Sequence, residues 1–123
     1  LKEPIMSSVV HFAVLLVCCS ANDITLHNKC SYTVWPGIRG NSGKATPDNG
    51  GFILDASQSK TMSVAADWAG RMWGRTYCDS KSKHCLTGDC GNKVECNGAG
   101  GAPPTTIAEF TLGGANGTDY YDI

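Results

Sequence analysis

Hydrophobic residues along this chain occur in short runs that alternate with polar ones, and the spacing typical of a helix is rare. Clusters of Gly, Pro and Asn at 40–43, 48–51 and 98–104 separate the runs. Alternation with a period of two is typical of strands that bury one face, and many short strands between such turns predict an all-β sandwich. The predicted strands are 24–27, 32–35, 52–54, 60–64, 71–76 and 105–112.

The same alternation predicts which charged side chains point away from the core. In 105–112, Ala108, Phe110 and Leu112 form one apolar face of the strand, so Glu109 points the other way, together with Ile107 and Thr111. In 119–123, another strand-like segment, Asp122 shares a face with Tyr120. The pattern alone leaves open whether Glu109 and Asp122 meet.

A short apolar run at 9–19 ends in Cys19-Ser20-Ala21, with a small residue where a signal peptidase would cut. This pattern predicts a secretory signal, and eleven residues are too few to cross a bilayer, so a membrane anchor is the weaker alternative. We therefore assign residues 1–21 to upstream sequence and signal, with Met6 as the start, and 22–123 to one domain.

Four of the five cysteines after the predicted signal are clustered, with six, four and five residues between them: Cys78, Cys85, Cys90 and Cys96. In a secreted protein this spacing predicts short-loop disulfides. A zinc site is the weaker alternative, because structural zinc sites favour pairs two to four residues apart. The fifth, Cys30, leaves an odd number, which indicates a reactive thiol, an intermolecular bridge or a partner outside this sequence.

The cysteine cluster also carries a motif. Gly-Arg-Thr-Tyr-Cys at 74–78, followed by Cys-Leu-Thr-Gly-Asp-Cys-Gly at 85–91 and then Cys96, resembles the signature of thaumatin-like proteins. Segments 28–35, 103–112 and 119–123 resemble the same family, so the resemblance covers nearly all of 24–123.

The resemblance implies a thaumatin-like β-sandwich with a disulfide-rich loop region. It implies the bonds Cys78–Cys85 and Cys90–Cys96, and pairs Cys30 with a cysteine near the C-terminus of the longer family members. Residues 22–123 are then expected to be a partial thaumatin-like domain, incomplete at its C-terminus.

Many thaumatin-like proteins line a cleft with one arginine, one glutamate and three aspartates. The resemblance places Arg71, Glu109 and Asp122 at three of these positions, and the other two would follow Ile123. Some members bind or cleave β-1,3-glucans, which implies Glu109 as proton donor, Asp122 as the second catalytic carboxylate and Arg71 as a substrate-binding residue. Glycoside hydrolysis requires such a pair of carboxylates. The alternative is that these residues are ordinary solvated charges on strand faces.

Three further features have less specific interpretations. Asp89, in the Thr-Gly-Asp turn, is expected to accept local backbone hydrogen bonds rather than to act in catalysis. Asn116 begins an Asn-Gly-Thr sequon and is a predicted glycosylation site. The three tryptophans are either platforms for sugar rings or, more commonly, buried side chains of the sandwich: Trp35, Trp68 and Trp73.

The composition of the chain excludes some classes of function. The chain has 123 residues, 41% of them hydrophobic, and a net charge of -1 with scattered basic residues, which argues against a nucleic-acid partner. We expect no cofactor, no metal and no membrane span, and a monomer at full length. The leading hypothesis is a secreted, extracellular antifungal defence protein that binds β-1,3-glucan or another fungal-wall polysaccharide, with weak endo-β-1,3-glucanase activity as its enzymatic form.

Two alternatives remain. One is a non-catalytic module that engages a receptor or a basic partner through its acidic face. The other is a taste-active or storage-like role through a basic surface, which the slight excess of acidic residues disfavours.

Overall fold

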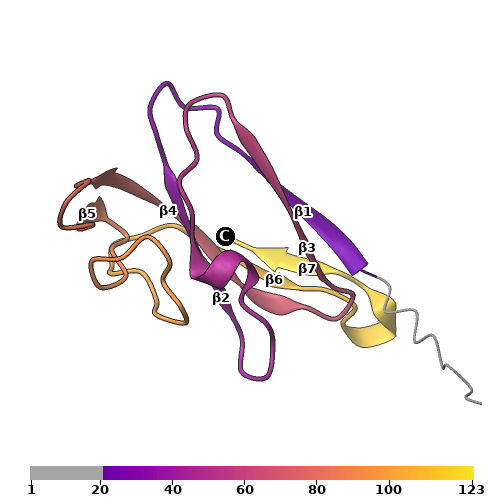
Figure 1. Ribbon diagram of the computed structural model, residues 1–123. Coiled ribbons are helices and arrows are strands. Elements are labelled where there is room, and N and C mark those ends of the chain that lie inside the picture. The colour runs from indigo at the N-terminus through magenta and orange to yellow at the C-terminus, as the bar shows by residue number, and fades with distance from the viewer. Residues whose placement is uncertain (1–20) are drawn as a thin grey trace, which may run out of the picture.

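The computed structural model describes residues 21–123, and its regular structure is almost entirely β (Figure 1). The described strands are β1 (Ala21–His27), β2 (Trp35–Gly40), β3 (Ser59–Ala65), β4 (Ala69–Cys78), β5 (Cys85–Thr87), β6 (Ile107–Thr111) and β7 (Tyr120–Asp122). Two short 3-10 turns, η1 (Pro47–Gly50) and η2 (Ala115–Gly117), are the helical elements of this region. The predicted signal lies outside the described residues except for Ala21, which begins β1.

The strands form two antiparallel sheets that pack as the layers of a sandwich, which confirms the predicted fold class. β1 pairs with β3 in the smaller sheet. The larger sheet has the order β2-β4-β6-β7, and β5 pairs with the far end of β4. That end, with β5 and the loop after it, lies at one side of the molecule (Figure 1).

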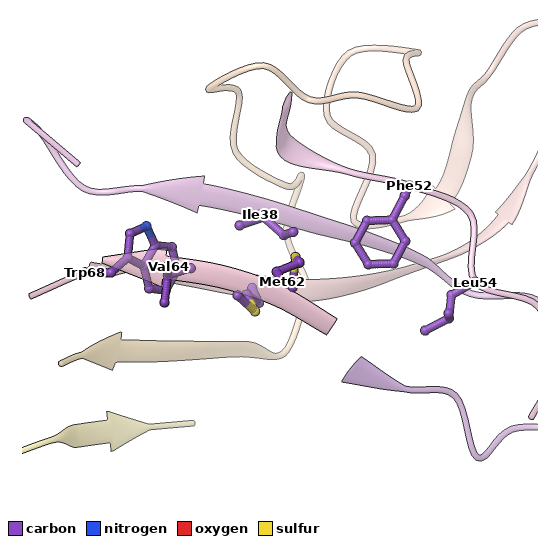
Figure 2. Close-up of a cluster of buried hydrophobic side chains, with 7 residues drawn as sticks. Ile38, Phe52, Leu54, Met62, Val64 and Trp68 are labelled. Atoms are coloured by element: carbon purple, nitrogen blue, oxygen red, sulfur yellow. The ribbon is translucent and has the colours of Figure 1, made fainter. Parts of the chain in front are cut away.

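The main core lies between the two sheets (Figure 2). Trp68 is 1% exposed, and its indole Nε1 donates a hydrogen bond of 2.7 Å to the carbonyl of Ala45, so the one polar atom of the ring is satisfied. Burying each large apolar side chain contributes about 1.5–3 kcal/mol. The members of this core are Ile38, Phe52, Leu54, Met62, Val64, Trp68 and Met72.

A second, smaller cluster holds the disulfide-rich loops against the outer face of the larger sheet. Its buried members are Trp73, Cys90 and Cys96. One disulfide joins Cys90 to Cys96, and another joins Cys78 to Cys85 across the β4–β5 pair. These are the two bonds that the family resemblance implies. Cys30 is half-buried and has no disulfide partner within the described part of the chain.

The predicted strand at 32–35 is wrong, because the chain turns there before it extends. The side-chain amide of Asn28 donates to the carbonyls of Tyr32 and Leu54 at 2.8 and 3.0 Å, and its oxygen accepts the N–H of Cys30 at 2.9 Å. Regular pairing starts only at Trp35, in β2. Pro36 is compatible with this strand because β2 lies at an edge of its sheet.

The predicted strand at 52–54 is also wrong as a regular element. The segment keeps the expected alternation, since Phe52 and Leu54 are buried while Ile53 is 54% exposed. Its pairing, however, is limited to the isolated bridge between Leu54 and Val34, and Gly51, just before the segment, forms another with Gly37. The other predicted strands are present with shifted ends, and the short β5 was not predicted.

Candidate functional site

Four charged residues form a straight row across the larger sheet. Arg39 of β2 lies directly opposite Arg71 of β4, Arg71 opposite Glu109 of β6, and Glu109 opposite Asp122 of β7. Directly opposed residues in antiparallel strands project to the same face. The neighbouring residues Ile38 and Met72 are buried in the main core, so the row occupies the outer face of the sheet. We call these four residues the charged row.

The three residues that the family resemblance selects are thus brought together by the pairing of β4, β6 and β7. The Arg71 Nη2 lies 3.7 Å from the Glu109 Oε1, and the two side chains are 39% and 57% exposed. An ion pair this exposed contributes only about 0–1 kcal/mol to stability. The fold therefore does not depend on the pair, and both side chains remain available to a ligand.

The two carboxylates face open hollows on both sides. Glu109 and Asp122 line a hollow of about 480 Å³ together with residues 105–107. They also line a second one, of about 290 Å³, with Tyr120, which is 52% exposed. Asp122 forms no ion pair with any described residue, and its Oδ1 accepts the N–H of Ile123 at 2.9 Å. This arrangement can receive a polar ligand that carries many hydroxyl groups.

Trp73 forms the wall beside the charged row rather than a platform within it. It lies two residues after Arg71 on the same face but is only 4% exposed. Its ring packs against Gly37 and Gly101 so closely that a Cβ atom at either position would lie 2.3 or 2.5 Å from a ring atom. Its Nε1 donates to the carbonyl of Gly88 at 2.8 Å. Trp73 thus pins the glycine-rich loop and the Thr-Gly-Asp turn to the sheet, and Trp68 is likewise buried, so neither is a sugar platform.

Arg75 is fully buried, although it lies on the same face of β4 as the half-buried Arg71, so the alternation in the sequence did not indicate its burial. Its guanidinium joins β2 to the loop at 93–94. It donates to the carbonyls of Trp35, Pro36, Lys93 and Val94, at 2.9, 3.0, 2.7 and 2.6 Å, and to the Cys90 sulfur at 3.3 Å. Burial lowers the pKa of Arg75, and the nearby Asp89 carboxylate opposes this shift. Arg75 therefore holds the site's framework and is not available to a ligand.

Asp89 has the turn-forming role expected from the sequence. Its carboxylate accepts the backbone N–H groups of Cys85, Gly91 and Asn92 at 2.9, 3.1 and 3.2 Å. Burial alone would raise the pKa of Asp89, but these three donors outweigh it, with a smaller contribution from His84, and the pKa is lowered. Asp89 is thus an ionised turn former and stays outside the charged row.

Two residues beside the predicted site were missed or undervalued. Arg39 follows the wrongly placed strand 32–35, so no face was predicted for it. Tyr120 was predicted to share a face with Asp122, and no role was assigned to it.

Asn116, the predicted glycosylation site, is exposed in η2. Within residues 21–123 no cluster of His, Cys, Asp and Glu is suited to a metal ion, and no helix has the length and apolarity to cross a membrane.

Comparison with known proteins gives consistent matches. The model of the Thaumatin family matches residues 28–123. Thaumatin-like protein 1 of Arabidopsis thaliana is 46% identical over 97% of this chain and 50% of its own length. Pathogenesis-related thaumatin-like protein 3.5 of Cryptomeria japonica is 50% identical over 84% of this chain and 43% of its own length. The chain thus spans about half the length of the curated relatives it matches.

A solved structure is also similar. The thaumatin-like xylanase inhibitor TLXI is 33% identical in sequence to this chain, and the two structures superpose with a TM-score of 0.56. The match covers 71% of this chain and 58% of the inhibitor.

Proposed function

Because this chain belongs to the thaumatin family, we propose that it is a secreted defence protein that binds β-1,3-glucan of fungal walls at the outer face of its larger sheet. Weak endo-β-1,3-glucanase activity is the enzymatic form of this proposal. Pathogenesis-related relatives support the defence role. The two disulfides in the described residues support passage through an oxidising compartment and an extracellular location.

The observation that carries the proposal is the register that sets Glu109 between Arg71 and Asp122. Glycoside hydrolysis uses one carboxylic acid to protonate the leaving oxygen and a second carboxylate to act on the opposite side of the scissile bond. In our proposal Glu109 donates the proton and Asp122 is the second carboxylate. Arg71 binds the sugar hydroxyls and holds Glu109 in place through their ion pair.

The test is a comparison of the complete gene product with its Glu109→Gln variant on insoluble β-1,3-glucan, measuring both binding and the release of reducing sugar. Glu95→Gln is the matched control, because Glu95 is also exposed but lies outside the larger sheet. We expect wild type and Glu95→Gln to bind and release sugar, and Glu109→Gln to bind without release. If all three bind and none releases sugar, the site is a lectin-like one; if wild type fails to bind, the glucan proposal is wrong.

The second candidate is a protein-binding module, favoured by the structural similarity to a thaumatin-like xylanase inhibitor. Here the exposed carboxylates of Glu109 and Asp122 would engage a basic surface on another protein. Inhibition of a xylanase by wild type, and its loss in a Glu109→Gln, Asp122→Asn double variant, would support this function. No inhibition by wild type would exclude xylanases as the partner.

The exposed Asn116 is our proposed glycosylation site. Protein secreted from eukaryotic cells should lose mass on treatment with an N-glycan-releasing enzyme, and the Asn116→Gln variant should not.

A further inference from the structure

We propose that Arg39 extends the polysaccharide site onto β2 and determines how strongly the protein binds longer glucan chains. This inference rests on the proposed function and assigns a role to a residue that the family resemblance did not select.

The proposed role is supported first by the position of Arg39 in the larger sheet. Arg39 continues the charged row by one strand beyond Arg71, so the row reaches from β2 to β7. Neighbouring strands lie about 4.8 Å apart, and the four strands therefore place the ends of the row about 14 Å from each other. A single sugar ring cannot contact both Arg39 and Asp122. An extended oligosaccharide lying across the strands can.

The proposed role is also supported by the guanidinium of Arg39, which is unpaired within the described residues. Arg71 has Glu109 as its partner, whereas Arg39 makes no ion pair and no side-chain hydrogen bond with any residue of the described region. Two like charges directly opposite each other are destabilising, so the position of Arg39 is not explained by the folding of the sheet. A free guanidinium offers five N–H donors in a planar fork, which suits the closely spaced hydroxyl groups of a sugar.

The guanidinium of Arg39 is, in addition, accessible to a ligand. Arg39 is exposed, and the neighbouring chain is the glycine-rich loop at 98–101. A Cβ atom at Gly100 would lie 3.6 Å from the Arg39 Nη1, so this loop passes beside the guanidinium without a side chain to cover it. The close packing of Gly101 on Trp73 holds the loop in this place. Arg39 is thus an open donor at one end of the row.

The position and the free guanidinium of Arg39 predict that its contribution to affinity depends on the length of the glucan. A short glucan bound at Glu109 and Asp122 does not reach β2, so it is insensitive to Arg39. A longer glucan reaches β2 and gains a contact with Arg39. Losing one hydrogen-bonding charged group should weaken binding about tenfold.

The experiment measures the affinity of the complete gene product for β-1,3-linked glucose disaccharide and hexasaccharide by calorimetry. We expect Arg39→Gln to weaken the hexasaccharide about tenfold and to leave the disaccharide within about twofold of wild type. Glu109→Gln should still bind both ligands and should change the two affinities by the same factor, because both ligands lie at Glu109. Lys81→Gln is the control for loss of an exposed positive charge far from the row and should change neither.

Arg39→Lys adds a second readout, because an ammonium keeps the charge but loses the planar fork, and it should restore only part of the hexasaccharide affinity. Equal effects of Arg39→Gln on both ligands, or no effect on either, would overturn the role of Arg39 while glucan binding stands. If wild type binds neither oligosaccharide, the proposed function fails, and this inference fails with it.

Discussion

Replacing the buried Arg75 by lysine tests whether hydrogen bonding by its guanidinium, rather than its charge, holds the disulfide-rich loops to the sheet. The side chain is 0% exposed, and its donors reach carbonyls on two separate segments. Two of these carbonyls belong to β2, at Trp35 and Pro36, and two to the loop at 93–94. A lysine keeps the positive charge but has three donors on one atom, so it cannot serve both segments.

The expected magnitude follows from the count of carbonyls left without a donor. Lysine at position 75 can reach one segment, and it costs least when it serves the loop. On β2 the carbonyl of Pro36 then keeps the N–H of Phe52 at 3.4 Å, and only the carbonyl of Trp35 loses its donor. A buried acceptor without a partner costs about 1–3 kcal/mol. We therefore expect Arg75→Lys to lower the free energy of unfolding by about 2 kcal/mol, and Arg75→Met, which removes the guanidinium donors from both segments, to lower it further.

The assay is urea unfolding of the complete gene product with its disulfides intact. Arg39→Lys is the matched control, because the same exchange at an exposed arginine should change stability by less than about 0.5 kcal/mol. A free energy of unfolding for Arg75→Lys within about 1 kcal/mol of wild type would show that the geometry of the guanidinium contributes little.

Two further substitutions test the turn and the wall of the site. Asp89→Asn should lower stability at neutral pH by about 2 kcal/mol, because an amide cannot accept all three N–H bonds of the carboxylate. The pKa of Asp89 is lowered on folding, so its contribution is complete above its ordinary value of 3.8 and is lost as the pH falls through the lowered value. Unfolding measured from neutral to acidic pH should show this loss in wild type, and an equal slope in Asp89→Asn would contradict it. Gly101→Ala should cost about 1–3 kcal/mol through its clash with Trp73, whereas Gly100→Ala, where the added methyl has room, should be nearly neutral in the same measurement.

Local chemistry made several features predictable. The alternation of 105–112 correctly predicted that Glu109 is exposed, and β6 does display it away from the core. The Thr-Gly-Asp turn indicated Asp89 as a local hydrogen-bond acceptor, which it is. Both inferences depend only on neighbouring residues, through the period of two along a strand and the short reach of an aspartate side chain.

Errors arose where a distant segment decides the local structure. The predicted strand at 32–35 failed because the amide of Asn28 binds the carbonyl of Leu54, far along the chain, and turns the segment. Arg71 and Arg75 occupy equivalent positions in one alternating strand, yet the side chain of the first is 39% exposed and that of the second is fully buried. The difference comes from the disulfide loop that covers Arg75, and nothing in the strand itself encodes that cover.

The all-β class, the turn formed by Asp89 and the face on which β6 displays Glu109 thus followed from the sequence, because these depend on side-chain period and local backbone preference. The alignment of Arg39, Arg71, Glu109 and Asp122 in one row came instead from the pairing of four strands in the folded protein. Register between strands is set by which segments pair and by how their apolar faces meet in the core, and a shift of one residue would turn a whole strand to the other face. Binding across the sheet therefore depends on packing that no single strand specifies.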